Sequence, residues 1–461
     1  MTSNPLRQRL AAIACVLCWA AAAMAGDWPQ WRYDAGRTAW SPEPLDSDLR
    51  LQWVRELPEP RPAWPASQKR LQFDASYEPI AAGGLLIVGS MADDSVAAYQ
   101  AATGELVWRF CTDGPVRFAP VSYHGKVWAA SDDGHLYCLD LPTGKLLWKF
   151  RGGLDGRKVI GNGRLVSLWP VRGGPVLHDG TLYFAAGIWP FMGTFIYAID
   201  PDSRQVRWCN SASGSRWTLQ PHFSPAFAGV APQGYLAAGA DTLFVSGGRT
   251  VPAAFDAKTG GLKYFNLASR EVSKISGGYE VAVAGEFHFN SGQMHRIADD
   301  SLAAEVSASV YGPGEMYGLD KGELLAGSYK PKEVQYTDRL GKKASKGVAS
   351  VIWKHKLPQP LKRLFMRAGN CLYASTPGGE AVAIDPAQPT QFAWQAKVEG
   401  EPWTMLAADG RLFVVTLDGR IYCFAGQAVA QPKRYALAKA DRKSTRLNSS
   451  HLGRSRMPSS A

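Results

Sequence analysis

Residues 120–150 read PVSYHGKVWAASDDGHLYCLDLPTGKLLWKF, and this stretch contains short apolar runs separated by turns. The turns are His-Gly, Asp-Asp-Gly and Pro-Thr-Gly, which accept positive φ or hydrogen-bond their own backbone. With one strand before the first turn, the stretch predicts a four-stranded antiparallel sheet. One such sheet cannot bury both of its faces, so it requires copies of itself alongside.

Variants of this stretch recur along the chain. Six copies stand out, at 79–110, 120–150, 175–208, 225–265, 361–398 and 401–426. A seventh ends near Trp353 after a polar insertion at 330–346, and a degenerate copy lies at 277–310. The last copy lacks an outer strand, which LRLQWVREL at 49–57 can supply. The sequence predicts an all-β fold: a single β-propeller of four-stranded antiparallel blades, closed by the N-terminal strand. It has eight blades if the degenerate copy is one, and seven otherwise.

The spacing of Asp140, Thr143, Gly144 and Trp148 resembles the tryptophan-docking signature of pyrroloquinoline-quinone-like β-propellers. In that signature Thr-Gly makes the turn into the outer strand, and the Trp wedges between neighbouring blades. WD-repeat propellers are the alternative, but no Gly-His and Trp-Asp pattern recurs here. The resemblance implies a blade-docking role for Trp53, Trp108, Trp148, Trp208, Trp353 and Trp394.

Three further segments resemble a secreted bacterial subgroup with quinoprotein-like propellers. They are DWPQWR at 27–32, WPVRGG at 169–174 and GIWPF at 187–191. Members of that subgroup include chains with an additional C-terminal domain, such as a methyltransferase. The resemblance thus allows the chain to be the N-terminal part of a larger polypeptide.

Both ends of the chain differ from the repeats. Residues 1–25 have the basic, apolar and small-residue order of a signal peptide, which predicts cleavage before Gly26 and a periplasmic or secreted protein; a retained anchor is the alternative. The propeller is expected over 26–430. Residues 431–461 predict a disordered tail, of which 441–461 resembles translated adapter or vector sequence.

The net charge depends on these ends. Without Arg7, Arg9 and the residues after Ala440, 44 Lys and Arg stand against 39 Asp and Glu. That balance does not favour nucleic acid as a partner. The mature region contains no transmembrane segment, and we expect a monomer. Its five cysteines form no CxxC pair, and Cys138 and Cys423, which share a repeat position, are expected to be buried strand residues.

Irregular residues gather in two kinds of loop, those that link blades and those between second and third strands. In a four-stranded meander both kinds lie on one face. Arginines beside aromatic side chains suit a flat anionic ligand, although such residues also stitch loops together. The candidate ligand-binding residues at this rim are Arg117, Trp169, Arg172, Trp189, His222 and Arg249.

No catalytic residue and no metal ligand set is predicted. The family resemblance implies pyrroloquinoline quinone with calcium, an aspartate base and often a vicinal disulfide. The sequence has no adjacent cysteines, and Asp132-Asp133-Gly134 is too short for a calcium site. Two functions remain: a binding or scaffold propeller that holds a protein or small molecule at its rim, and a quinone-dependent alcohol or sugar dehydrogenase.

Overall fold

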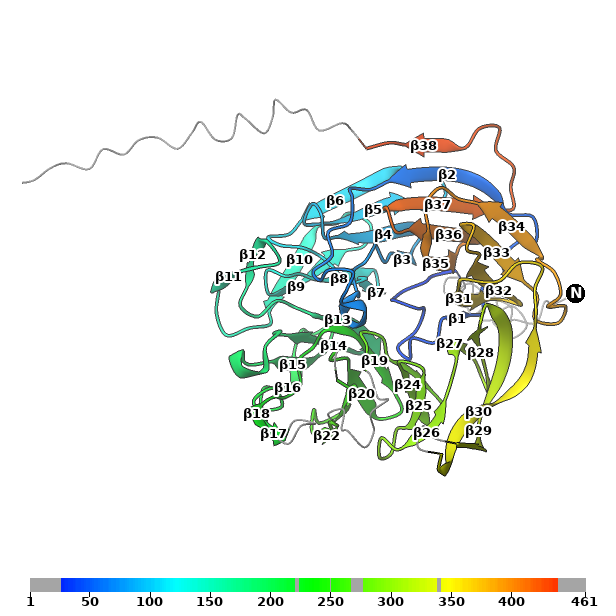
Figure 1. Cartoon of the computed structure of the whole chain (residues 1–461). Helices are drawn as coiled ribbons and strands as arrows, with labels where there is room; N and C mark the ends of the chain where they lie inside the picture. The colour runs from blue at the N-terminus through cyan, green and yellow to red at the C-terminus, as the bar shows by residue number, and fades with distance from the viewer. Residues whose placement is uncertain (1–25, 220–223, 249, 267–276, 338–340, 438–461) are drawn as a thin grey trace, which may run out of the picture.

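A computed structural model shows a ring of four-stranded sheets around a central channel (Figure 1). It describes residues 26–219, 224–248, 250–266, 277–337 and 341–437. Two 3-10 turns, η1 (Lys69–Leu71) and η2 (Pro190–Met192), stand among these strands. Within the described ranges no helix has the length and apolar character needed to cross a bilayer. The expected leader and residues 441–461 lie outside these ranges.

The all-β expectation is confirmed, and the described strands form eight blades. Blade 1 comprises β3 (Ile80–Ala82), β4 (Leu85–Ser90), β5 (Ser95–Gln100) and β6 (Leu106–Cys111), and blade 2 comprises β7 (Val121–Tyr123), β8 (Lys126–Ala130), β9 (His135–Asp140) and β10 (Leu146–Arg151). Blade 3 comprises β13 (Gly173–His178), β14 (Thr181–Ala186), β15 (Phe195–Ile199) and β16 (Val206–Asn210), and blade 4 comprises β19 (Gly234–Gly239), β20 (Thr242–Val245), β21 (Ala253–Asp256) and β22 (Leu262–Tyr264). Blades 5 to 7 comprise β23 (Ala282–Ala284), β24 (Phe287–Asn290), β25 (Gln293–Arg296), β26 (Leu302–Glu305); β27 (Ala308–Tyr311), β28 (Glu315–Asp320), β29 (Glu323–Thr337), β30 (Lys343–His355); and β31 (Arg363–Ala368), β32 (Cys371–Ser375), β33 (Glu380–Ile384), β34 (Trp394–Lys397). The degenerate copy at 277–310 is therefore a true blade, blade 5.

The N-terminal strand closes the ring as predicted. Blade 8 takes three strands from the C-terminal part of the chain, β35 (Pro402–Ala408), β36 (Arg411–Thr416) and β37 (Arg420–Ala425). Its outer strand is β2 (Arg50–Glu56), which pairs antiparallel with β37. Because β2 precedes every strand of blades 1 to 7 and completes blade 8, the ring leaves no open junction between its two ends.

Two expected boundaries differ from the structure. The tail was expected to begin at residue 431, but β38 (Lys433–Tyr435) pairs in parallel with β2 and adds a fifth strand to blade 8. The fourth copy was expected from residue 225, but β18 (Pro225–Phe227) pairs with β17 (Trp217–Leu219) in a separate hairpin, and blade 4 begins at β19. A second added hairpin, β11 (Lys158–Gly161) with β12 (Arg164–Ser167), lies between blades 2 and 3.

The docking of Trp108 explains why the spacing of the repeat recurs along the chain. Its indole Nε1 donates to the carbonyl oxygen of Leu141 in the next blade, 2.8 Å away. The ring lies against Gly144, where φ is +68° and an added Cβ would come within 2.4 Å of the indole. Glycine is therefore required twice, for its left-handed backbone and for the close approach of the ring.

Other docking tryptophans repeat this contact. Trp53 Nε1 donates to the carbonyl oxygen of Ala101 at 3.0 Å, and Trp208 Nε1 donates to that of Ala257 at 3.0 Å. Trp394 Nε1 donates to the carbonyl oxygen of Leu49 at 2.7 Å. Trp148 and Trp353 are partly buried against the hydrophobic core. Cys138 and Cys423 are buried, as expected from their shared position.

An N-terminal segment fills one end of the channel, and its blue trace lies inside the ring in Figure 1. Residues 26–41 of this segment include β1 (Trp40–Ser41), which pairs with β31. The segment accepts a backbone N–H from the inner part of every blade. The eight donors, from blade 1 to blade 8, are Ala81, Ser122, Leu177, Ala238, Val283, Tyr311, Arg367 and Asp409. The donors lie near the turns from first to second strands, so the loops linking successive blades surround the opposite end, here called the upper face.

Candidate functional site

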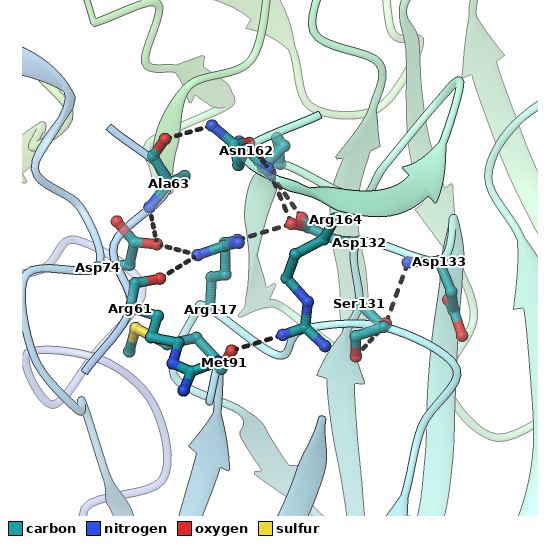
Figure 2. A network of polar contacts seen from close by, with 12 residues as sticks. Arg61, Ala63, Asp74, Met91, Arg117, Ser131, Asp132, Asp133, Asn162 and Arg164 are labelled. Atoms are coloured by element: carbon teal, nitrogen blue, oxygen red, sulfur yellow. Dashed lines mark hydrogen bonds and ion pairs between the residues drawn. The ribbon is translucent and has the colours of Figure 1, made fainter. Parts of the chain in front are cut away.

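Loops on the upper face bring Arg117, Asp132 and Arg172 together from three different connections. Arg117 precedes β7, Asp132 follows β8 and Arg172 precedes β13. Figure 2 shows Arg117 between Asp132 and Asp74, and Asp74 belongs to the long connection between β2 and β3. The expectation that both kinds of loop share one face is met for these residues.

The four side chains form a buried ionic network, here called the buried quartet (Arg117, Asp74, Asp132 and Arg172). Arg117 Nε lies 2.6 Å from Asp132 Oδ2, and Arg117 Nη1 lies 2.6 Å from Asp74 Oδ2. Arg172 contacts the same Asp132 through Nε and Nη2, over 2.5 and 2.8 Å. Both guanidinium groups are almost fully shielded from solvent. Two arginines and two aspartates make the network neutral.

Burial and the arginines act in opposite directions on the two carboxyl groups. Burial alone would raise the pKa of Asp132, but Arg172 and Arg117 outweigh it, so this pKa lies below its ordinary value. Burial outweighs the same two arginines at Asp74 and raises its pKa. Asp132 contacts both guanidinium groups directly, which explains why it is the better stabilised anion.

The added hairpin β11–β12 and the β2–β3 connection cover the buried quartet. Asn162, in the turn of the hairpin, accepts a bond from Arg172 Nη2 at 3.0 Å and donates to the carbonyl of Ala63 (Figure 2). Arg164 of the same hairpin donates to the carbonyl of Met91 at 3.1 Å. These contacts give Arg117 and Arg172 a structural role in holding the upper-face loops; whether they also touch a ligand stays a prediction.

Trp169 and Trp189 lie in the same region but in different environments. Trp169 is buried, and its Nε1 donates to the carbonyl of Met192 at 2.7 Å, which fixes the loop containing η2. Trp189, in that loop, is 48% exposed. The other two rim candidates, His222 and Arg249, lie outside the described residues.

An apolar pocket of about 490 Å³ opens beside this loop, here called the upper pocket. Trp64, Leu71 and Trp189 provide its large apolar side chains, and Gln233 lies beside them. Trp64 Nε1 donates to Gln233 Oε1 at 3.2 Å, which fixes the orientation of its indole. The wall comes from the β2–β3 connection and from loops of blades 3 and 4, so no single repeat encodes the pocket.

A second polar group lies in the channel wall, around Glu78. This side chain accepts a bond from Trp403 Nε1 at 2.8 Å, and Arg363 stacks over the Trp403 ring at 4.3 Å. Burial raises the pKa of Glu78 to about 7, although Arg363 lowers it. Glu78, Arg363 and Trp403 come from blades 1, 7 and 8, and sequence reasoning singled out none of the three.

No curated protein sequence matches the chain. A family model described as outer membrane protein assembly factor BamB matches residues 31–167. Among solved structures, the quinohemoprotein alcohol dehydrogenase from Comamonas testosteroni is similar at 16% identity and a TM-score of 0.57, over 89% of this chain and 82% of that one. A europium-containing methanol dehydrogenase is similar at 13% identity and a TM-score of 0.57, over 87% and 98%. BamB from Moraxella catarrhalis is similar at 14% identity and a TM-score of 0.50, over 82% and 100%.

The chain folds as a β-propeller similar to those of the quinoprotein dehydrogenases and BamB. At these identities the likeness concerns the fold, and quinoprotein-like propellers include both dehydrogenases and an assembly factor by their names. The residues of this propeller must therefore decide whether a quinone fits.

Pyrroloquinoline quinone does not fit the channel residues of this quinoprotein-like propeller. Two channel pockets beside Trp31 measure about 20 and about 160 Å³, and both are smaller than the roughly 300–1,000 Å³ typical of a small-molecule site. The cofactor is a tricyclic quinone with three carboxylates, which would require free cations. Arg363 lies 3.7 Å from Glu280, and the arginines of the buried quartet are already paired with aspartates.

The described residues also lack support for the calcium ion. One group of three side chains in the described part of the chain could hold a metal, and it consists of His288, His295 and Asp300. Calcium takes six to eight oxygen ligands, so two imidazoles are the wrong donors for it. No step of quinone chemistry is therefore derived for this propeller.

Proposed function

We propose that the chain is a binding propeller of the periplasm or the secreted space, and that its upper pocket receives an apolar segment of a partner protein. The proposal rests on the upper pocket, which measures about 490 Å³ and is walled largely by apolar side chains. Two of these side chains are the indoles of Trp64 and Trp189. A pocket of this size accepts one or two large side chains. The charged groups beside it, the buried quartet, neutralise one another and leave little attraction for an anion.

Exposed aromatic residues continue the upper pocket outward. Trp189 and Phe191 stack with ring centroids 6.1 Å apart, and they are 48% and 63% exposed. Trp217 of the neighbouring hairpin is 68% exposed. Aromatic side chains are enriched at the centres of protein interfaces and account for much of the binding energy there. Their presence on one face supports a protein partner more than a small polar ligand.

The similarity to BamB supports the same reading, because the family model that matches residues 31–167 is named for an assembly factor. The N-terminal leader expected from the sequence supports export. We expect the exported chain to be a monomer, which light scattering of the purified protein can test.

A display library of short peptides, selected on the purified propeller, tests the proposal. We expect enriched peptides with aromatic or large aliphatic side chains. The Trp189→Ala variant should weaken their binding at least about 10-fold, which corresponds to about 1.4 kcal/mol. Ile352→Ala, an exposed apolar residue on β30 of blade 6, is the matched control and should leave binding unchanged. Enriched peptides that bind Trp189→Ala as well as the wild type would refute the upper pocket as the site.

The alternative is a quinone-dependent alcohol or sugar dehydrogenase, which the similarity to two dehydrogenases supports at the level of fold. Purified protein incubated with pyrroloquinoline quinone and calcium should then show dye-linked alcohol oxidation. An unchanged quinone spectrum and no oxidation would exclude this activity under the conditions used. The two proposals are separable because peptide binding requires neither quinone nor calcium.

A further inference from the structure

Blade 5 places two histidines side by side inside the protein. In the hairpin of β24 and β25, His288 pairs directly with His295, so both side chains leave the sheet on the same face. Their rings stack with centroids 5.0 Å apart and an interplanar angle of 20°. His288 is completely buried and His295 is 1% exposed. Two buried imidazoles on neighbouring strands are a common origin of metal sites.

Asp300 brings a carboxylate to these rings from the turn between β25 and β26. Its Oδ1 lies 2.9 Å from His288 Nε2 and 3.4 Å from His295 Nδ1. One donor atom from each of the three residues lies within 4.8 Å of the others. Donors held about 2.0–2.1 Å from a tetrahedral zinc ion are about 3.3–3.4 Å apart. The cluster therefore needs only a small contraction to surround a zinc ion.

The electrostatics of the cluster favour a cation. Asp300 is 8% exposed, and the ion-pair partners found for it among the described residues are His288 and His295. No lysine or arginine of the described ranges makes an ion pair with it. Among the described residues, the charge of the buried carboxylate is offset by hydrogen bonds with His288 and Asn266. A divalent ion would neutralise it, and imidazole with carboxylate is a donor set that zinc accepts.

A neighbouring residue already orients the carboxylate. Asn266, just after the outer strand of blade 4, donates from Nδ2 to Asp300 Oδ2 at 2.6 Å. This leaves Oδ1 turned toward both histidines. Ligating carboxylates usually have such a second partner, which holds the ligand in place.

The cluster also replaces the usual contact between blades. Blade 4 has Tyr264 where six other blades have a docking Trp, and the turn of blade 5 has Asp299-Asp300 in place of Thr-Gly. Tyr264 still donates to the carbonyl of Ile297 at 2.9 Å, and Phe244 of blade 4 lies 4.6 Å from His288. A bound ion would fasten this junction, where the tryptophan contact is missing.

We propose that His288, His295 and Asp300 bind one zinc ion, which stabilises blade 5 and its junction with blade 4. The sequence predicts no metal site, and the inference does not depend on what the upper pocket binds. The role is structural because the cluster is buried. It also lies away from the upper face, at the end of blade 5 that holds the turn between β25 and β26.

Tag-free full-length protein, dialysed against chelator and then titrated with Zn²⁺, tests the site. We expect about one zinc per chain by mass spectrometry of the metal and a melting temperature that rises with zinc. Co²⁺ in place of Zn²⁺ should give the visible absorption of a tetrahedral ion. The variants His295→Gln and Asp300→Asn should weaken zinc binding by more than about 100-fold.

His124→Gln is the matched control, because His124 lies 3.4 Å from Asp202 as an exposed histidine–aspartate pair. It should retain the wild-type zinc content and the zinc-dependent rise in melting temperature. If Asp300→Asn fails to fold, the stoichiometry of the wild type and of His295→Gln still decides the question. A folded wild type that takes up no zinc, or variants that bind as tightly as the wild type, would overturn the proposal and leave a hydrogen-bonded triad.

Discussion

The indole Nε1 of Trp53 donates to the carbonyl oxygen of Ala101, 3.0 Å away, and this bond joins blade 8 to blade 1. Trp53 lies on the N-terminal strand β2, so the contact secures the junction at which the ring closes. The indole is 1% exposed and also covers Gly104. The same kind of contact joins other neighbouring blades, but at this junction it also holds the two ends of the ring together.

Trp53→Ala should therefore cost about 3–5 kcal/mol of unfolding free energy, because it removes a fully buried indole and its hydrogen bond. Trp189→Ala is the matched control, since Trp189 is 48% exposed, and should change the free energy by less than about 1 kcal/mol. Denaturant unfolding followed by fluorescence measures both. Equal losses would show that β2 does not secure the ring through its tryptophan.

Two glycines with the same backbone conformation separate the docking contact from the turn. Gly144 and Gly125 have φ of +68° and +70°, but an added Cβ meets Trp108 at 2.4 Å only in the first case and has no neighbour within 4 Å in the second. Gly125→Ala should cost about 1–2 kcal/mol for the left-handed backbone. Gly144→Ala should cost about 1–3 kcal/mol more for the clash, as thermal or denaturant unfolding can measure. A similar cost at both positions would contradict tight packing of the indole.

The buried quartet predicts that replacing one of its carboxylates by an amide will lower the stability of the protein substantially. Asp132→Asn leaves two buried guanidinium groups with one carboxylate and should cost about 3–5 kcal/mol of stability. Asp155→Asn is the control, because Asp155 pairs with Arg157 at 2.9 Å on the surface, and it should leave the stability nearly unchanged. Calorimetry of the three proteins checks the difference. A mild Asp132→Asn variant would mean that the quartet is not needed to hold the loops.

Glu78 predicts a dependence of stability on pH. Its pKa rises from an ordinary 4.5 to about 7 in the folded protein, mainly through burial, so folding favours the protonated form. The contribution of Glu78 is fully present below pH 4.5 and is lost as the pH rises through 7. At 1.36 kcal/mol per pKa unit, the loss is about 3 kcal/mol.

The neutral variant Glu78→Gln isolates this contribution. Relative to the wild type, it should gain about 3 kcal/mol of unfolding free energy between pH 4.5 and pH 8. Glu286→Gln, on the exposed turn between β23 and β24, should show no such trend. Parallel pH dependences of Glu78→Gln and the wild type would contradict an ionisation of Glu78 in this range.

Much of the fold could be predicted from the sequence because the docking contact demands fixed residue types at fixed spacing. Residues of the same types as Thr143, Gly144 and Trp148 recur along the chain for that reason. The strand around Trp53, which stands before the first copy of the repeat, predicted how the ring closes. The N-terminal segment in the channel could not be predicted, because most of its bonds to the first strands use backbone groups that any residue offers.

The site was less accessible to sequence reasoning. Arg117 and Arg172 were expected on one face and meet there around Asp132, but Asp74, which pairs with Arg117, comes from an irregular connection with no repeat pattern. The zinc-site proposal depends on the pairing of His288 with His295, and the degenerate repeat concealed that register. Irregular loops and degraded repeats carry the specific chemistry, whereas the regular positions carry the packing.

The path of residues 26–56 determines the order in which the molecule can be completed. These residues are synthesised before every blade, yet their partners include Asp409 and the strand β37. Blade 8 and its junction with blade 1 cannot form until the last strands have been synthesised. Contacts between distant parts of a chain form slowly, and open sheet edges are prone to aggregate in the meantime. We therefore expect the junction between blades 8 and 1 to form last, when β2 pairs with β37.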